Sequence, residues 1–190
     1  MSFIRIVQVL LCWAAVAVCA PAGAQTWIGA ELGSSDAKDF CKDFGSSCDK
    51  TGTPWRIFGG TYLTPNFGIE AGYIDLGRMN ASDAASDVKL ESRAGEVLGL
   101  IAFRARQASI FAKFGGYYAL TKLTLVTNGL TTRRTENNGG LVYGAGAQVN
   151  LTPSFGVRGD WQRYAKVGNT STGGETDMNT FLVGVVWNFR

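Results

Sequence analysis

The last ten residues of the chain constrain its fold most strongly, because bulky apolar residues alternate strictly along them. From Phe181 to Phe189 every second residue is large and apolar, whereas Gly184 and Asn188 lie on the opposite face of the same segment. A strand of about 9–11 residues that ends on an aromatic residue is typical of a membrane-crossing β-strand. A half-buried strand of a soluble β-sandwich has the same pattern, so the rest of the chain must discriminate between the two.

Seven further segments carry strand patterns, which makes eight in all. They lie at residues 26–32, 53–63, 67–77, 90–103, 110–118, 141–151 and 155–162. The connections alternate between short turns (64–66, 104–108, 152–154) and longer polar stretches (33–52, 78–89, 121–138, 166–177). Outer-membrane barrels have short turns at one end and long loops at the other, whereas a soluble sandwich has no reason to alternate them. We therefore predict an all-β fold, an eight-stranded antiparallel up-and-down transmembrane β-barrel.

The fourth segment, residues 90–103, has the least regular pattern. Val97, Ile101 and Phe103 suit a lipid face. Leu98 and Leu100 would then point inward, and we expect a β-bulge in this segment. The ends of the polar stretch 121–138 are expected to extend their flanking strands beyond the membrane.

Charged residues in mid-strand lie opposite the apolar row: Glu70, Lys113, Arg158 and Asp160. In a membrane barrel they would face a lumen that side chains nearly fill, where charges must pair or hold water. A secreted lipocalin-like binding barrel is the alternative, with the apolar row inside and the charges outside. The alternating connections and the aromatic strand ends favour the membrane barrel. The aromatic residues expected at the membrane interfaces are Trp27, Trp55, Tyr73, Trp161 and Trp187.

Residues 1–24 are predicted to be a cleaved signal peptide. Arg5 precedes an almost unbroken apolar run, and Ala22-Gly-Ala24 matches a cleavage signal. Cys19 raises a lipoprotein alternative, against which the bulky Val18 argues. Residues 25–190 are then a single barrel domain, without an apolar segment long enough for a spanning helix.

The mature chain offers few groups suited to chemistry. Its formal charge is +2, which is the +3 of the full chain less the charge of Arg5. This charge is too small and too evenly mixed to indicate nucleic acid binding. Cys41 and Cys48 remain, and in an exported protein we expect them to form a disulfide that closes a loop. A metal site would need more ligands than two cysteines, and the chain has no histidine, so no metal site is expected. No cofactor is expected either.

Three stretches resemble the OmpA-like family of small outer-membrane barrels: Phe67–Met79 (FGIEAGYIDLGRM), Thr152–Gln162 (TPSFGVRGDWQ) and Val183–Phe189 (VGVVWNF). They are similar to the third, seventh and eighth strands of that barrel. The resemblance implies an outer-membrane location in a Gram-negative cell and a non-enzymatic role in anchoring or surface contact. It implies, as partners, outer-membrane lipid and lipopolysaccharide, the barrel-assembly machinery during biogenesis, and a surface ligand met by external loops. It implies a monomer that binds no nucleic acid.

The resemblance also bears on the lumen. In the family, an inward Glu on the third strand and an inward Arg on the seventh form an internal gate, and these positions match Glu70 and Arg158. The positions of the alternative partners that let the gate switch match Leu100 and Gln148, so both partners are missing. The resemblance therefore implies a buried neutralising pair, with a low-conductance pore gated around Glu70 and Arg158 as the alternative.

The terminal strand resembles the signal that the assembly machinery recognises. The matching residues are Gly184, Trp187 and Phe189, and Arg190 follows as an additional residue.

Two further hypotheses concern other residues. A lipid-modifying enzyme usually needs a His base, which this chain lacks, although Asp75, Glu91 and Glu96 could supply carboxylates near the outer rim. Rim carboxylates are more often solvated loop anchors. The basic pair within residues 132–136 would either meet lipopolysaccharide phosphate or form a solvated loop tip.

Overall fold

The computed structural model describes residues 25–37, 47–49, 51–83, 86–127, 130–169 and 174–189. The predicted signal peptide, residues 1–24, and Cys41 lie outside these ranges, and so does the side chain of Cys48. The domain limits and the Cys41–Cys48 disulfide therefore stay predictions. In the same described ranges, no helix is long and apolar enough to cross a bilayer.

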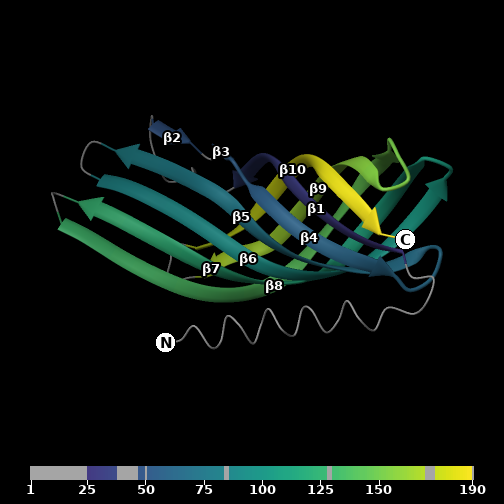
Figure 1. Ribbon diagram of the computed structural model, residues 1–190. Helices are drawn as coiled ribbons and strands as arrows, with labels where there is room; N and C mark the ends of the chain where they lie inside the picture. Colours follow the sequence, from purple (N-terminus) through teal and green to yellow (C-terminus); the bar gives the residue numbers. More distant parts are fainter. Residues whose placement is uncertain are drawn as a thin grey trace, which may run out of the picture.

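The described residues form one antiparallel sheet that closes on itself (Figure 1). Its strands are β1 (Thr26–Ala37), β2 (Ser47–Asp49), β3 (Thr51–Gly52), β4 (Trp55–Tyr62), β5 (Phe67–Asp83), β6 (Ser86–Ala105), β7 (Ala108–Thr127), β8 (Leu130–Asn150), β9 (Phe155–Asn169) and β10 (Gly174–Phe189). Strand β10 pairs with β1 from Thr26↔Phe189 to Ala37↔Met178, which closes the ring. The predicted eight-stranded antiparallel barrel is confirmed by β1 and β4–β10. Strands β2 and β3 are short additions that pair with β5 and β1.

Successive residues of each long strand alternate between the outer face and the lumen, as the pleat requires. In β10, for example, Phe181 and Val183 are exposed and Leu182 is buried. Large apolar residues are exposed on every long strand, among them Ile28, Ile57, Ile69, Val97, Ile110, Leu141, Val157 and Val185. The lipocalin-like alternative is therefore wrong, because it would place this apolar row inside and the charges outside.

One end of the barrel, which we call the turn end, closes its hairpins in short turns at residues 63–66, 106–107 and 151–154. Two of these turns contain Thr-Pro and are capped in the same way. The hydroxyl of Thr64 accepts a hydrogen bond from the backbone N–H of Phe67, and that of Thr152 from the N–H of Phe155, each at 3.0 Å. In both turns the threonine hydroxyl therefore accepts a hydrogen bond at the end of the strand ladder. The proline that follows it has no backbone N–H to donate to that ladder.

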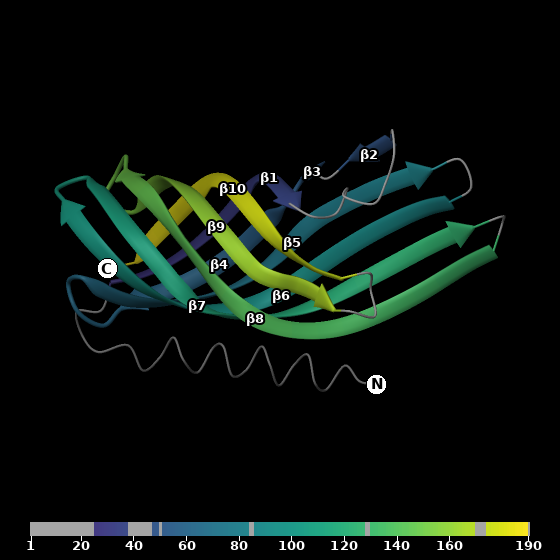
Figure 2. The same ribbon diagram turned by 180° about the vertical axis from the view of Figure 1, so that it is seen from behind.

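At the opposite end, which we call the extended end, β5–β8 continue beyond the other strands (Figures 1 and 2). Strands β7 and β8 pair from Ala108↔Val149 to Thr127↔Leu130 without a register shift. The expected polar loop at residues 78–89 is wrong, because residues 78–83 and 86–89 belong to the paired strands β5 and β6. Residues 121–127 and 130–138 likewise lie in strands throughout, and not only at their ends. Their many β-branched threonines favour strands.

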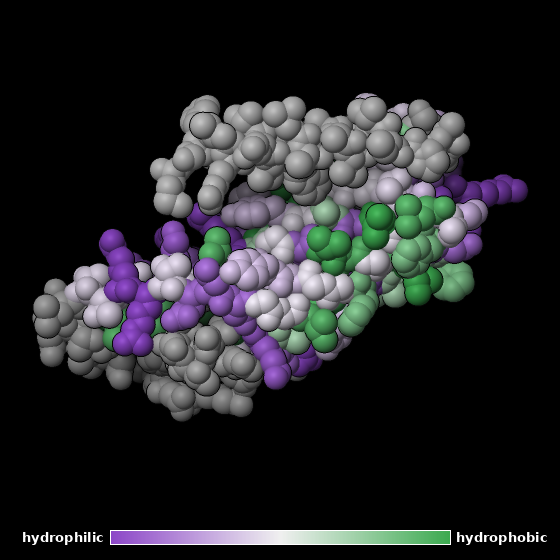
Figure 3. Space-filling view, turned by 90° about the horizontal axis from the view of Figure 1, so that it is seen from below, coloured by the Kyte–Doolittle hydropathy of each residue, from purple (hydrophilic) through white to green (hydrophobic). Residues whose placement is uncertain are grey.

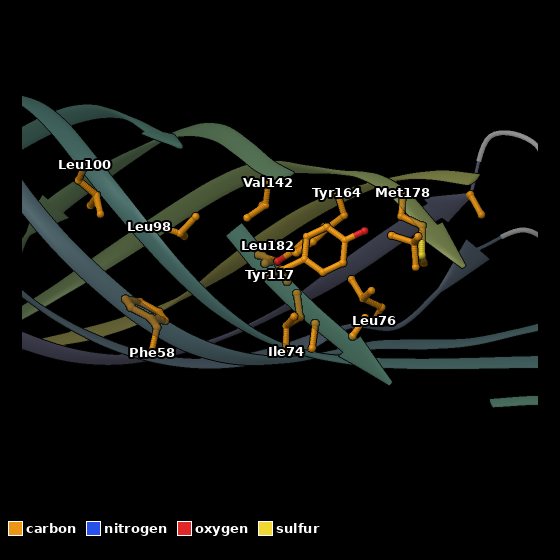
Figure 4. Packing of buried hydrophobic residues seen from close by; sticks show 14 of the residues in the cluster. Phe58, Ile74, Leu76, Leu98, Leu100, Tyr117, Val142, Tyr164, Met178 and Leu182 are labelled. Carbon is orange, nitrogen blue, oxygen red and sulfur yellow. The ribbon is translucent and has the colours of Figure 1, made fainter. Parts of the chain in front are cut away.

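A β-bulge lies in β5, where the register against β6 shifts between Asp75 and Arg78. Gly77 has a φ of 85° there, and a Cβ on it would lie 2.7 Å from the backbone nitrogen of Thr53, so this position needs glycine. The bulge expected within residues 90–103 is wrong, because β6 alternates regularly opposite β7. Leu98 and Leu100 point into the lumen, as Figure 4 shows.

We predict that Gly184→Val destabilises the barrel, because the lumen has no room for a side chain at this position. A Cβ on Gly184 would lie 2.6 Å from both the Cα and the Cγ of Glu31 on the neighbouring strand. Such overpacking typically costs about 1–3 kcal/mol. Urea unfolding of the detergent-refolded chain, followed by tryptophan fluorescence, measures the change.

The matched control is Gly95→Val on the outer face, where a Cβ would meet no atom within 4 Å. An equal loss of stability in both variants would contradict the packing explanation.

Candidate functional site

The lumen contains a set of buried charged side chains, which we call the lumen charge cluster. Its members come from six strands: Glu31 (β1), Arg56 (β4), Glu70 (β5), Glu96 (β6), Lys113 (β7), and Arg158 and Asp160 (β9). None has more than 4% of its surface exposed. Each lies between outward-facing neighbours on its strand, so the strand pleat alone directs all seven side chains inward. The cluster is the most charged feature that the described residues bury.

Arg56 is the centre of the cluster. Its guanidinium donates to Glu96 Oε1 at 2.5 Å, to Glu70 Oε1 at 2.6 Å and to Glu31 Oε2 at 3.1 Å. A fourth carboxylate, that of Asp160, lies 3.6 Å from its Nη1 atom. One planar fork of donors thereby joins four strands, because Arg56 and its three acceptors come from β4, β1, β5 and β6.

The structure also brings the predicted pair together. Arg158 donates from Nη1 and Nη2 to the two oxygens of Glu70 at 2.8 and 3.3 Å, and from Nε to Asp160 at 3.1 Å. Lys113 donates to the same Asp160 oxygen at 2.6 Å and lies 3.8 Å from Glu70. Four carboxylates thus meet three cations across the lumen, and the cluster is nearly neutral.

Aromatic side chains enclose the cluster. The guanidinium groups of Arg56 and Arg158 lie 4.4 and 4.5 Å from the ring centre of Phe58, and Arg158 lies 4.3 Å from that of Phe111. Cations at this distance from a ring face are attracted to it. On the side of the extended end, the hydroxyl of Tyr164 donates to Glu96 at 2.6 Å. Tyr164 lies close to Tyr117 and Leu182 in Figure 4, and its ring centre is 5.4 Å from that of Tyr117.

The prediction that Trp27 lies at a membrane interface is wrong. Its side chain is buried in the lumen, and its Nε1 donates to Glu70 Oε2 at 3.1 Å. The register of β1 decides this, because Trp27 and Glu31 share the inward face while Ile28 and Leu32 face outward. The other four aromatic residues, Trp55, Tyr73, Trp161 and Trp187, have outward positions. Trp55 and Tyr73 are in contact there, with ring centres 5.7 Å apart.

Sequence reasoning missed Arg56 and Glu31, and it did not assign Glu96 to the set of lumen charges. Arg56 lies between the exposed residues Trp55 and Ile57, so the period of two was a usable signal. The carboxylate dyad suggested for the outer rim does not form. Glu96 points into the lumen, whereas Asp75 and Glu91 lie on the outer face and pair with Arg93 and Arg78. No group of three or more His, Cys, Asp or Glu among the described residues could hold a metal ion.

Inward glycines make room for the large members of the cluster. A Cβ on Gly72 would lie 3.1 Å from Glu96 Oε1 and 3.3 Å from the Cβ of Phe58. The space beside Gly146 is taken by Asp160 Oδ1 and by the ring of Phe111. The small residues therefore leave room for their bulky neighbours in the lumen.

Comparisons with known proteins agree with this architecture. The family model of the outer membrane protein beta-barrel domain matches residues 9–189. Outer membrane protein A of Salmonella typhi is 29% identical over 198 residues, which cover 98% of this chain and 54% of that protein. The chain spans about half the length of the curated relatives it matches.

Solved structures show the same fold. The attachment invasion locus protein Ail of Yersinia pestis aligns with a TM-score of 0.61 at 16% identity, over 88% of this chain and 100% of that one. The outer membrane protein OprG of Pseudomonas aeruginosa aligns with a TM-score of 0.60 at 15% identity, over 89% and 97%.

We predict that Arg56→Met strongly destabilises the barrel. The substitution removes three hydrogen bonds and leaves Glu31, Glu70 and Glu96 without a buried cation that they share. Removing one partner of a buried ion network typically costs about 3–5 kcal/mol. The measurement is again urea unfolding of the refolded chain.

Arg93→Met is the matched control, because Arg93 makes a single salt bridge, to Asp75, with a half-exposed side chain. Exposed pairs contribute about 0–1 kcal/mol. If Arg56→Met lowered the free energy of unfolding no more than this control does, the lumen charge cluster would not be needed for the stability of the barrel.

Proposed function

Since this chain belongs to the outer membrane protein beta-barrel family and lies in the outer membrane, we propose that it is a non-enzymatic structural and surface-contact protein. The barrel anchors the chain in the bilayer, and the extended end of β5–β8 reaches beyond the membrane to meet a partner. In this proposal the turn end faces the periplasm, because periplasmic turns are short in such barrels and external segments are long.

The observation that carries the proposal is the paired extension of β5–β8. A hairpin that continues its ladder far past the neighbouring strands has no part in closing the barrel. The last pairs of β7 and β8, from Thr121↔Glu136 to Thr127↔Leu130, hold this extension in the form of a rigid ribbon. A rigid ribbon binds a partner at a lower entropic cost than a mobile loop does.

The lumen charge cluster supports an anchoring role. Ion pairs that join strands from most of the barrel circumference fix the strands relative to one another. The same side chains occupy the space through which a solute would pass. The two positions at which a switching gate would need charges carry Leu100, which is buried, and Gln148, which donates to Asn150 at 2.8 Å. We therefore favour a closed plug over the gated pore.

The proposed partners follow from the surfaces. The apolar outer face is expected to contact outer-membrane lipid and lipopolysaccharide. The end of β10, with Gly184 and the exposed residues Trp187 and Phe189, is proposed as the signal for the barrel-assembly machinery. A surface ligand would bind the extended end. We propose that the protein is a monomer, because a closed sheet has no free edge that a second copy would have to cover.

We predict that the refolded chain gives no stepwise ion conductance in planar bilayers, because Arg56, Arg158 and Phe58 fill the lumen. A variant that empties this region, Arg56→Ala with Phe58→Ala, is expected to conduct if it still folds. Folding is checked by the faster migration of the unboiled band on a gel. Channels in the parent chain that Arg158→Gln abolishes or alters would favour the gated pore instead.

We also predict that shortening the β7–β8 hairpin removes surface contact and leaves the barrel intact. Thr121 and Glu136 are cross-strand partners, so replacing residues 122–135 by Asn-Gly keeps the register and supplies a two-residue turn. Cells that display the shortened chain should lose most of their adherence to protein-coated and glycan-coated surfaces. The amount of heat-modifiable protein in the outer membrane should not change.

Equal adherence of cells displaying the parent and the shortened chain would contradict the surface-contact role. The control is Asn128→Asp, which changes one residue between β7 and β8 and keeps the full length of the chain there.

A further inference from the structure

The turn end of the barrel holds Gln25, the residue that directly precedes β1. The cleavage predicted after Ala24 makes Gln25 the first residue of the mature chain. A glutamine in this position carries both a primary amine and a side-chain amide, and these two groups can join in a five-membered lactam. The surroundings of Gln25 therefore affect how readily it cyclises.

Three side chains meet at the mouth of the lumen at this end: Gln25, Tyr62 and Arg104. Each continues the inward face of its strand, as Gln25 does two residues before the buried Trp27. The Nη1 atom of Arg104 donates a hydrogen bond to the side-chain oxygen of Gln25, Oε1, at 2.8 Å. The closed ring thus joins residues that are 79 positions apart in the sequence.

Tyr62 positions both partners of this hydrogen bond. Its backbone N–H donates to the backbone oxygen of Gln25 at 3.1 Å, which fixes the start of β1. The guanidinium of Arg104 lies 3.3 Å from the centre of the Tyr62 ring, a distance at which a cation is attracted to the ring face. The same ring packs against Trp27 in the lumen, with ring centres 4.5 Å apart. The contact between Gln25 and Arg104 is therefore supported by a residue that is itself anchored.

Arg104 makes the side-chain amide of Gln25 a better electrophile. In cyclisation the lone pair of the α-amine attacks Cδ, and negative charge develops on Oε1. A cationic donor at 2.8 Å from that oxygen stabilises this charge. The bond from Cδ to Nε2 then breaks, and Nε2 leaves as ammonia with a proton that the amine gives up. The step needs no oxidant, reductant or second substrate.

The charge at the turn end favours the same reaction. The described segments there, residues 25–28, 59–69, 101–112, 149–157 and 185–189, contain Arg104 and Arg106 but no aspartate or glutamate. Nearby cations disfavour the charged form of an amine, and the neutral amine is the form that attacks. Figure 3 shows hydrophilic residues projecting from the turn end, past the hydrophobic residues gathered beside it, so the released ammonia enters water.

We propose that Gln25 is a modification site, at which the mature chain closes its own N-terminus as pyroglutamate while Arg104 stabilises the transition state. The lactam keeps its carbonyl oxygen as an acceptor for Arg104 and loses the N-terminal positive charge. It has no free α-amine, so aminopeptidases have no group to recognise. Strand β1, which closes the barrel against β10, then begins at a capped and anchored residue. The premise is cleavage after Ala24, and the proposal is independent of the surface-contact role.

The first measurement is the mass of the mature chain purified from the outer membranes of cells that express the whole precursor. The expected mass is that of residues 25–190 less one ammonia. The control is Gln25→Asn, because the shorter side chain cannot form the five-membered lactam and should keep its ammonia. A mature chain that begins with unmodified Gln25, or at any other residue, would overturn the proposal.

The second measurement tests the role of Arg104 with purified protein. The chain is refolded behind a leader that a site-specific protease removes directly before Gln25, and the loss of ammonia is followed by mass spectrometry. Folding is checked by the gel shift of the unboiled band. Arg104→Met should slow cyclisation about 10-fold, less than the roughly 100-fold lost with a buried oxyanion donor, because the mouth is open to water.

The matched control is Arg106→Met, which removes the same charge two residues further along the hairpin and should cyclise as fast as the parent. Tyr62→Leu removes the ring under Arg104 but keeps the backbone N–H, so its folded rate should fall toward that of Arg104→Met. In guanidinium chloride all these chains should cyclise at one rate, slower than that of the folded parent. Equal rates of the folded parent and folded Arg104→Met, or an equal slowing in Arg106→Met, would refute the assistance by Arg104.

Discussion

The closure of the backbone ladder between β10 and β1 is the constraint on which the rest of the structure depends. In hydrocarbon no water can satisfy an unpaired N–H or C=O group, so a sheet in a membrane must leave no free edge. The twelve-residue register from Thr26↔Phe189 to Ala37↔Met178 meets this requirement, because it joins the first long strand to the last. Once the ring is closed, every strand has one face toward lipid and one toward a narrow lumen.

The lumen charge cluster follows from that geometry. Eight strands enclose a space that side chains just fill, and water cannot solvate the charges there freely. Charges placed inside must therefore neutralise one another, which Arg56, Arg158 and Lys113 do with four carboxylates. The inward glycines make this arrangement possible by leaving space for the charged side chains. Gly72, Gly146 and Gly184 give the room that Glu96, Asp160 and Glu31 occupy.

The same strands serve two environments along their length. Within the apolar band, outward residues such as Val97 and Ile110 are hydrophobic, because they face lipid. Past the aromatic row at Tyr73 and Tyr118, the outer face carries charged residues such as Arg93 and Lys122, whereas the inner face still buries Leu76 and Leu90. The ladder continues there with ion pairs such as Arg93–Asp75 and with β-branched threonines. One continuous set of strands thus changes the chemistry of its outer face along its length.

The alternation of residues along each strand is local, and the sequence by itself therefore determined which residues share a strand face, the number of long strands and the positions of Glu70 and Arg158 opposite the apolar row. It also placed the short turns, because proline and threonine interrupt a ladder locally. Contacts between distant strands depend on the register and the stagger of the closed ring, which no single segment encodes. Only the tertiary structure decided that Arg56 joins Glu31, Glu70 and Glu96. It also placed Trp27 in the lumen, although tryptophan is common at membrane interfaces, because the register of β1 directs this side chain inward. Residues 78–83, 86–89, 121–127 and 130–138 became paired strands for the same reason, since strand pairing is a property of two segments together.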